Sequence, residues 1–310
     1  MVVSVEKIPV LVICGPTGSG KTALALNLAE KFPLEIISAD SRQVYCRMDI
    51  GTAKATVSEQ AAIPHHMLDL VDPDQEFSVA DFVDRARPLI PQISGRGKIP
   101  CIVGGTGLYI RALLGGLANL PSADPKLRNQ LQRREEDEGA GSLYRELQQV
   151  DPVAAAGIHA NNLVRIIRAL EVCMVSGQKI SELKAQHNFS EKPYRVLKLA
   201  PDFPRDELYS RINQRTGQML SNGLVEEVNG LIDTYSFDLK TLQTLGYREV
   251  VQYLRGELTV GQLGDDIRKC TRQYAKRQLT WFRKEPDIIW VDSSMKSGKV
   301  IKSIDEFLHE

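Results

Sequence analysis

The sequence predicts an α/β fold, in which a parallel sheet is flanked by helices and carries an inserted all-helical subdomain. Three observations support this prediction: an apolar strand that leads into a glycine-rich loop and a helix, further apolar segments that alternate with amphipathic helices, and a stretch over residues 121–192 with helical periodicity alone. With 310 residues, of which 43% are hydrophobic and 25% charged, the chain can bury one large core or a core plus a subdomain.

The glycine-rich loop is the most specific motif. It lies between the apolar residues 8–14 and a helical pattern over residues 22–31, the strand-to-helix context that a phosphate-binding loop requires. Its glycines let backbone N–H groups surround an anion, Lys21 adds a cation, and the Thr22 hydroxyl can hold Mg²⁺. A chance match has a probability of about one per cent. We therefore expect a P-loop NTPase-like sheet with a diphosphate or triphosphate site formed by Gly15, Pro16, Thr17, Gly18, Ser19, Gly20, Lys21 and Thr22.

The second predicted strand, residues 34–38, delivers an acidic residue to the same edge of the sheet. Asp40 and Ser41 lie just past its end. Ligand sites of parallel sheets form at that edge. Asp40 is therefore a metal-orienting acid, a general base, or the N-cap of a helical segment over residues 41–45.

A second glycine-rich loop follows the strand predicted over residues 99–103. We expect one amphipathic helix before that strand, over residues 78–90, and another helix after the loop, over residues 108–114. The loop from Gly104 to Gly107 brings the backbone close to a ligand or only allows a helix to pack on a strand. The vicinal His65 and His66 are interpreted as loop or core histidines, because two adjacent rings do not easily share one metal.

The domain organisation follows from where strand patterns stop and resume. After the helical stretch, strands are expected over residues 194–200 and 288–291. We therefore expect a P-loop core over residues 1–120 and 193–310 and a helical insertion over residues 121–192. Helices are expected between the last two strands over residues 204–221, 224–235, 247–254 and 262–284.

The last of these helices is strongly basic. Between Arg268 and Lys284 the chain has seven Lys or Arg residues and no acidic residue. On a helical projection, four of them share a stripe about 60° wide. Such a stripe fits a polyanion such as nucleic acid, and the alternative is a solvated helix face. The four residues are Lys269, Arg272, Lys276 and Arg283.

Charge, cysteines and hydropathy limit the remaining classes. The net charge of zero excludes a globally polycationic nucleic-acid binder but not a local patch. The five cysteines are widely spaced without a C-x-x-C pair, and we expect reduced core residues. No apolar stretch spans a membrane, and the first seven residues lack a signal-peptide pattern, so we expect a cytoplasmic protein with no membrane partner.

A family resemblance rests on motifs that cover nearly the whole chain. In order, they are GPTGSGKT, SADSRQVY, MDIGTAK, GGTGLY, LPSADPKLR, RALEV, RINQRTGQMLSNGLVEEV, LGYREV and TRQYAKRQLTWFR. With these motifs the chain resembles the tRNA dimethylallyltransferases, a family of adenosine prenyltransferases. The chain has no counterpart of the C-terminal zinc finger of eukaryotic members, and it is similar to the bacterial type.

The resemblance implies transfer of a dimethylallyl group from dimethylallyl diphosphate to the exocyclic N6 amine of the adenosine immediately 3′ of the anticodon of a tRNA. In this interpretation Asp40 is the general base, which is worth roughly 10²–10⁴ in rate. Thr17 donates to the bridging oxygen of the leaving group, and Arg215 pairs with the diphosphate beside Lys21. Thr22 carries Mg²⁺ as the cofactor.

The resemblance also implies RNA contacts, because the target base must be flipped out of the anticodon loop. The motif NNLVRIIRALEV has Val164 where a Gln is expected. We expect the enzyme to act as a monomer on the anticodon stem-loop. The expected RNA contacts are Asp40, Ser41, Arg42, Gln43, Thr106, Arg128, Arg165 and Arg168, together with Lys269, Arg272 and Lys276 of the basic helix.

Two other functions account for part of the sequence. A P-loop kinase acting on a small acceptor would use the phosphate-binding loop but would leave the basic helix unexplained. A nucleotide-switched RNA-binding protein would use the basic helix but leave Asp40 without a role, and the N-K-x-D guanine motif is absent.

Overall fold

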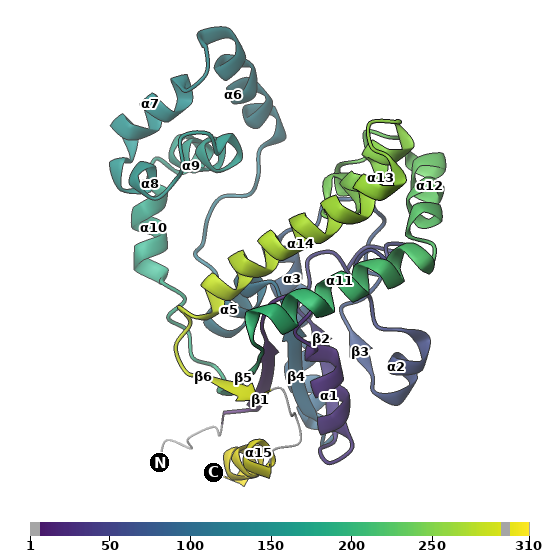
Figure 1. Ribbon diagram of the computed structural model, residues 1–310. Helices are drawn as coiled ribbons and strands as arrows, with labels where there is room; N and C mark the ends of the chain where they lie inside the picture. Colours follow the sequence, from purple (N-terminus) through teal and green to yellow (C-terminus); the bar gives the residue numbers. More distant parts are fainter. Residues whose placement is uncertain (1–6, 293–297, 310) are drawn as a thin grey trace, which may run out of the picture. The chain divides into compact units, whose positions relative to one another are not determined.

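The computed structural model describes residues 7–292 and 298–309 and contains the α/β fold that the sequence predicts (Figure 1). Its sheet has six strands in the order β3-β2-β4-β1-β5-β6, and all neighbouring strands are parallel. The central strand β1 pairs Leu11 with Cys101 on one side and with Leu197 on the other. The strands are β1 (Pro9–Cys14), β2 (Leu34–Ser38), β3 (His65–His66), β4 (Ile99–Gly104), β5 (Arg195–Asp202) and β6 (Ile288–Asp292).

Apolar strands and helices form the core on one face of the sheet. Leu11 and Ile13 of β1 pack with Leu24 of α1 (Lys21–Ala29), as the continuous apolar run of a doubly covered strand requires. The C-terminal helix α15 (Gly298–His309) adds Ile304 to this cluster. Sequence reasoning did not identify α15.

Two long helices lie side by side over the end of the sheet where β1 and β4 finish (Figure 1). They are α11 (Arg205–Ser221) and α14 (Val260–Phe282), and Ile212 packs with Ala275 at their contact. Beyond them, α12 (Leu224–Tyr235), the short 3₁₀ helix η1 (Lys240–Gln243) and α13 (Tyr247–Leu254) form a separate apolar cluster with the loop after β2.

The predicted helix over residues 78–90 is wrong in one respect, because it is two helices. α3 (Val79–Ala86) ends before Pro88, and α4 (Leu89–Gly95) begins after it. Arg87 keeps the α conformation, but Pro88 has no N–H to continue the helical hydrogen bonds, so α3 ends there. The preceding segment holds α2 (Val57–Ala62) and the edge strand β3, which contains the two half-buried histidines that were expected in a loop or in the core. α5 (Gly107–Gly115) follows β4.

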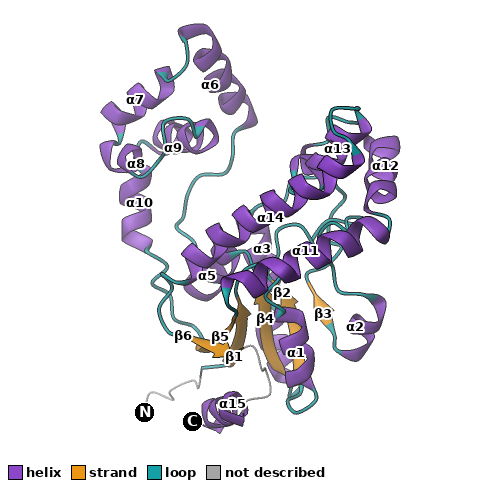
Figure 2. Ribbon diagram, viewed as in Figure 1, coloured by secondary structure: helices purple, strands orange, loops and turns teal. Residues whose placement is uncertain are grey.

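A second compact unit, residues Gly115–Glu191, consists of helices and loops (Figure 2). It begins at Gly115 rather than at residue 121 as expected, and the rest of the chain forms the first unit. Leu131, Leu147 and Leu170 belong to its own apolar core. Its helices are α6 (Pro125–Glu138), α7 (Ser142–Val150), α8 (Pro152–Ala156), α9 (Leu163–Ser176) and α10 (Ile180–His187).

A fully buried carboxylate, Glu171 of α9, holds the start of α6 against α9. It accepts the backbone N–H of Asp124 at 2.7 Å and two guanidinium bonds of Arg128 at 2.8 and 3.0 Å. Arg168 also pairs with it and donates to the carbonyl of Pro121 at 2.8 Å. Burial raises the pKa of Glu171, but the hydrogen bonds from the two arginines outweigh it, so the pKa lies below its usual value. Arg128 and Arg168, which we expected to contact RNA, thus have an internal partner.

This network predicts a stability effect confined to the second unit. Glu171→Gln removes the buried counter-charge of two arginines and should lower the free energy of unfolding by about 2 kcal/mol, since both arginines keep partial access to water. Chemical denaturation and hydrogen exchange of residues 115–191 measure the effect. The matched control is Glu182→Gln, whose exposed carboxylate lies 3.7 Å from Lys179 and should contribute less than about 0.5 kcal/mol. Equal effects of the two substitutions would contradict the prediction.

Candidate functional site

The phosphate-binding loop turns between β1 and α1. Gly18 has φ of 82°, and a Cβ there would lie 2.8 Å from the side chain of Ile212, so both the backbone and the approach of α11 require glycine. The Ser19 hydroxyl donates to the carbonyl of Pro16 at 2.8 Å and keeps the turn closed. Within the described residues, no group accepts the backbone N–H of Gly20, Lys21 or Thr22. These donors are the ones that a helix start offers to an anion.

Lys21 is a poorly compensated cation in this loop. Its Nζ donates to the carbonyl of Pro16 at 2.8 Å. Burial, and then the positive charge of Arg215, lower the pKa of Lys21 to about 8, against the smaller opposing effect of Asp40. A bound anion would restore the balance of charge, so the position favours phosphate binding.

α11 brings a second cation to the loop. Arg215 donates to the hydroxyl of Thr17, and Arg211 donates through Nε to the carbonyl of Gly18 at 3.0 Å. Burial lowers the pKa of Arg215 below its ordinary value. The structure therefore brings together two of the expected site residues, Thr17 and Arg215, which are far apart in the sequence.

Asp40 caps a turn instead of a helix. Its Oδ1 accepts the backbone N–H of Arg42 at 2.8 Å and that of Gln43 at 3.4 Å, and the following residues form turns. The prediction of an N-cap is therefore wrong, because no helix follows Asp40, although the carboxylate does order the local backbone. Among residues 7–292 and 298–309, no donor is bonded to the other oxygen, Oδ2. That oxygen is available for chemistry.

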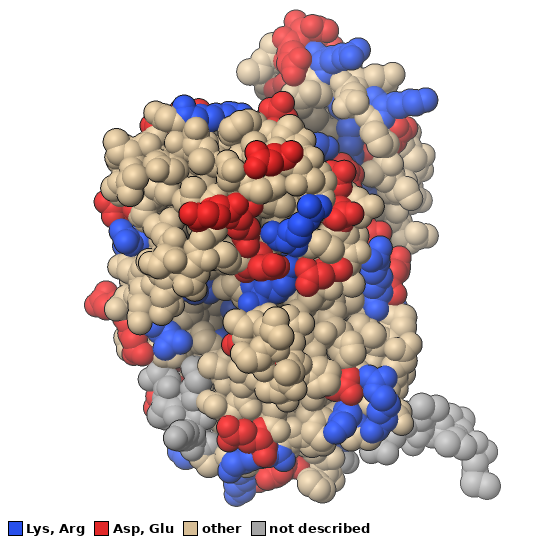
Figure 3. Space-filling model, turned by 90° about the vertical axis from the view of Figure 1, so that its right-hand side faces the viewer, with Lys and Arg blue, Asp and Glu red and all other residues tan. Residues whose placement is uncertain are grey.

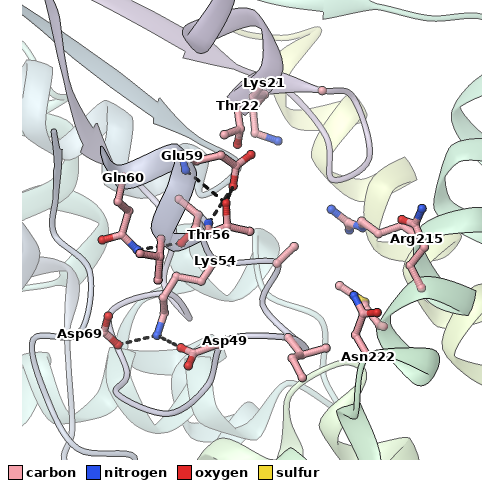
Figure 4. Close-up of a pocket in the computed structure, with 17 residues that line it drawn as sticks. Lys21, Thr22, Asp49, Lys54, Thr56, Glu59, Gln60, Asp69, Arg215 and Asn222 are labelled. Atoms are coloured by element: carbon pink, nitrogen blue, oxygen red, sulfur yellow. Dashed lines mark hydrogen bonds and ion pairs between the residues drawn. The ribbon is translucent and has the colours of Figure 1, made fainter. Parts of the chain in front are cut away.

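Two larger pockets border the loop, besides smaller ones. One, of about 470 Å³, is lined by Thr17, Asp40 and Arg215 on the loop side and by Gln273, Tyr274 and Arg277 of α14. The other, of about 660 Å³, is lined by Lys21, Thr22 and Arg215, among others. Figure 4 shows Lys21 and Thr22 on one side of this second space and Arg215 on the other. Arg215 lines both pockets and so connects the anion site to the space around Asp40.

The basic stripe of α14 does not face these pockets. Lys269 and Lys276 are exposed, and Arg272 donates to Asn213 of α11 at 3.1 Å. Arg272 thus takes part in the packing of α14 on α11, and its contact with RNA stays a prediction. Arg277, which was not among the expected RNA contacts, is exposed and lines the pocket of Asp40. The periodicity identified the helix, but only its packing shows which face is turned to the site.

The other expected contact residues differ in what their side chains already bind. The Thr106 hydroxyl accepts the backbone N–H of Ser41 at 3.1 Å, which joins the second glycine-rich loop to the Asp40 turn. Gln43 accepts from Ser38 at 2.9 Å and donates to the backbone of residues 52 and 53. Arg42 is exposed and lines the pocket of Asp40.

Two exposed positions of the second unit bear on the expected RNA contacts. Arg165 is exposed near the start of α9. Val164, which stands in place of the expected Gln, is 81% exposed. A valine there cannot supply the hydrogen bonds of an amide.

Sequence reasoning missed Glu227 of α12, which anchors a wall of both pockets. Its carboxylate accepts the backbone N–H groups of Asp49, Ile50 and Gly51 at 2.7–3.1 Å and the hydroxyl of Tyr247 at 2.6 Å. The wall is the loop between β2 and α2, and Lys54 holds it from inside through Asp49 and Asp69 (Figure 4). An acidic residue in an amphipathic helix gives no sequence signal for such a role.

The residues around Thr22 fit a magnesium ion. Thr22 and Asp40 line one small cavity of about 50 Å³ together with Lys21. Hydroxyl and carboxylate oxygens are ligands that Mg²⁺ accepts, and it is often held by few protein groups together with substrate phosphates. The described residues contain no cluster of three or more His, Cys, Asp or Glu that would form an all-protein site.

The surface and the thiols add two further findings. Acidic and basic side chains are intermingled on the face shown in Figure 3, so that face has no preference for a polyanion. The five cysteines are free thiols, of which Cys14 and Cys101 are buried, and burial raises the pKa of Cys14 to about 12. In the part of the chain that the structure describes, no helix is both long and apolar enough to cross a membrane.

The fold and the loop define a P-loop α/β protein with a carboxylate beside its anion site. The IPP transferase model matches residues 43–285, and the isopentenyl transferase model matches residues 8–69. The chain is 50% identical over 302 residues to tRNA dimethylallyltransferase 1 of Syntrophotalea carbinolica, covering 97% of this chain and 96% of that relative.

Two solved structures agree with this assignment. The full-length tRNA isopentenylpyrophosphate transferase of Bacillus halodurans is 40% identical with a TM-score of 0.70, and the match covers 98% of this chain and 96% of that one. A eukaryotic dimethylallyltransferase acting on tRNA is 30% identical with a TM-score of 0.84, over 97% and 80% of the two chains. The chain belongs to the IPP transferase family, and it is a tRNA-modifying prenyltransferase.

The lowered pKa of Lys21 predicts how substrate binding depends on pH. In the ligand-free protein Lys21 is charged at neutral pH and loses its proton as the pH rises through about 8. A bound diphosphate favours the charged form and raises this pKa. Affinity for dimethylallyl diphosphate should therefore be constant below that pH and fall by up to about tenfold per pH unit above it. Titration calorimetry in a series of buffers measures the profile.

The control is Lys21→Met, which has no titrating group in the loop and should bind weakly with a flat profile over the same range. A wild-type profile without a bend would show that Lys21 does not bind the diphosphate as its ammonium form.

Proposed function

We propose that this chain transfers the dimethylallyl group of dimethylallyl diphosphate to the exocyclic N6 amine of the adenosine immediately 3′ of the anticodon. The observation that carries the proposal is the shared pocket of Asp40, Thr17 and Arg215 beside the anion-binding loop. We assign Asp40 as the proton acceptor and Thr17 and Arg215 as the leaving-group donors around one reacting centre. Family membership supports the choice of a prenyl diphosphate and a tRNA as the two substrates.

The loop holds the diphosphate and stabilises it as it leaves. Lys21, Arg215 and the N–H groups at the start of α1 supply positive charge on fixed elements of the fold. The hydroxyl of Thr17 donates to the bridging oxygen, where charge develops as the carbon–oxygen bond breaks. Thr22 would hold Mg²⁺, which would supply further positive charge to the diphosphate.

Asp40 takes the proton that the amine must lose. The amine nitrogen forms a bond to the allylic carbon, the carbon–oxygen electron pair leaves with the diphosphate, and the N6 proton moves to Asp40. Oδ1 is engaged by the backbone of the Asp40 turn, so Oδ2 is the oxygen that accepts it. The turn fixes the carboxylate in the pocket, which a general base requires.

The tRNA is bound by exposed cations around the pocket and on the second unit. Arg42 and Arg277 line the pocket of Asp40 and are suited to the phosphates beside the flipped nucleotide, together with Ser41 at the turn. Lys269 and Lys276 add contacts that do not depend on sequence. Arg165 of the second unit adds another such contact. Gln43, Thr106, Arg128, Arg168 and Arg272 act mainly by holding these elements, because each has an internal partner.

The enzyme acts as a monomer in the cytoplasm, where its tRNA substrate is used. The alternative, a P-loop kinase acting on a small acceptor, has no feature in its favour beyond the loop itself. It requires ATP, whereas prenyl transfer releases diphosphate and needs none. Incubation with labelled dimethylallyl diphosphate and unmodified tRNA, beside an ATP turnover assay, separates the two.

Replacing Asp40 by its amide tests the base. Asp40→Asn keeps an oxygen that can accept the turn N–H bonds but cannot take a proton. Single-turnover transfer should fall by roughly 10²-fold or more, while tRNA and diphosphate affinities stay near wild type. Asp40→Ala, which loses the turn bonds as well, should also weaken binding. Near wild-type turnover of the asparagine variant would limit Asp40 to its role in the turn.

Neutralising the exposed lysines of α14 tests the RNA surface. The double substitution Lys269→Gln and Lys276→Gln should weaken binding of all tRNAs about equally. The slope of log affinity against log salt should decrease by about one unit for each phosphate that a lysine no longer neutralises. Affinity for dimethylallyl diphosphate should not change. Lys299→Gln, at an exposed position of α15, is the matched control with no expected effect. An unchanged slope in the double variant would show that these lysines are only solvated.

A further inference from the structure

The side-chain amide of Gln278 joins the two glycine-rich loops of the site. Gln278 lies on α14 and is only 8% exposed. Its Oε1 accepts the backbone N–H of Thr17 at 2.8 Å, and its Nε2 donates to the carbonyl of Gly105 at 2.9 Å. A backbone N–H only donates and a carbonyl only accepts, so the two partners fix the orientation of the amide.

The surroundings of Gln278 leave its amide little freedom. A Cβ at Gly105 would lie 2.5 Å from Nε2, so the second glycine-rich loop needs glycine where the amide crosses it. Ala275 and Phe282, about one turn away on either side, are buried on the same face of α14. Satisfied, buried amides of this kind hold backbone segments in one arrangement.

The contact with Gln278 determines which hydrogen-bond donor of Thr17 is available to a substrate. Its N–H is bonded to Gln278, so that group is not available to a phosphate. Its hydroxyl oxygen accepts from Arg215, so the hydroxyl hydrogen can be donated to another group. Thr17, Arg215, Gln278 and Asp40 line one pocket. The hydroxyl hydrogen is thus the donor that Thr17 offers to a substrate.

We propose that Gln278 is a positioning residue, which fixes the backbone of Thr17 so that its hydroxyl donates to the bridging oxygen of the leaving diphosphate. The inference rests on the role that the proposed function gives to Thr17. It predicts that loss of the amide lowers the rate of bond breaking without much effect on substrate binding. Small displacements of a donor from the position of the developing charge reduce transition-state stabilisation.

Gln278→Met removes both hydrogen bonds at similar side-chain volume. The rate of single-turnover prenyl transfer should fall by about tenfold or more, while the KM for dimethylallyl diphosphate and the tRNA affinity change by less than about threefold. Thermal unfolding monitors whether the variant is folded. Thr280→Ala, an exposed position on the same helix whose hydroxyl bonds only to the carbonyl of Lys276, is the matched control and should keep the wild-type rate.

A double-mutant cycle separates positioning from general support of the fold. Thr17→Ala removes the hydroxyl and keeps the N–H that Gln278 binds. If Gln278 acts through that hydroxyl, Gln278→Met should slow the Thr17→Ala enzyme by less than about twofold. If Gln278 only stabilises the site, the two effects should multiply, and the proposal is then wrong.

Gly105→Ala disturbs the same contact by changing the partner of Gln278, and it replaces Gln278→Met in the test if that variant does not fold. Its added Cβ displaces the amide, and it should reproduce the loss of rate and the same dependence on Thr17. A wild-type rate in Gln278→Met, or a rate loss in Gly105→Ala that multiplies with that of Thr17→Ala, would overturn the proposal. A wild-type rate in Thr17→Ala would instead remove the role of Thr17 from the proposed function, so the two failures are distinguishable.

Discussion

The close approach of α11 and α14 to the loops at the end of the sheet is the contact on which the site depends. The side chain of Ile212 in α11 lies 2.8 Å from where a Cβ at Gly18 would be, and that of Gln278 in α14 lies 2.5 Å from where a Cβ at Gly105 would be. Glycine in both loops therefore serves packing as much as the binding of phosphate. Because the helices come this close, Arg215 and Gln278 bond directly to Thr17 and hold the loop in one arrangement.

The electrostatics of the site follow from this packing. Lys21 and Arg215 are brought together in a partly buried space where Asp40 supplies one opposing charge, and their pKa values fall below the ordinary ones. A structure with two cations near one carboxylate is unfavourable by itself and improves when an anion binds.

Two buried or partly buried carboxylates show how the chain holds its irregular segments. Glu227 gathers three successive N–H groups of the loop between β2 and α2, and Glu171 gathers an N–H group and two guanidinium groups in the second unit. Charge-assisted hydrogen bonds of this kind are among the stronger ones in proteins. They order segments that have no regular secondary structure of their own.

The sequence by itself determined the elements and the anion site. The strand before Gly15, the helix after Lys21 and the position of Asp40 past the second strand follow from local periodicity and a short motif, because neighbouring residues alone decide them. The helix break at Pro88 is equally local, since it follows from the missing N–H of proline, although the periodicity of residues 78–90 hides it.

Only the tertiary structure decided which groups the long side chains contact. From the sequence alone, Arg128, Arg168 and Arg272 were expected to bind RNA. In the structure, Arg128 and Arg168 pair with the same carboxylate of α9, and Arg272 donates to a residue of α11. No sequence pattern predicted a role for Gln278, because its two hydrogen-bond partners lie in loops more than 170 residues away in sequence. A basic pattern gives the charge of a helix, whereas the rotation of the helix against its neighbours decides whether that charge is exposed to a substrate or used within the fold.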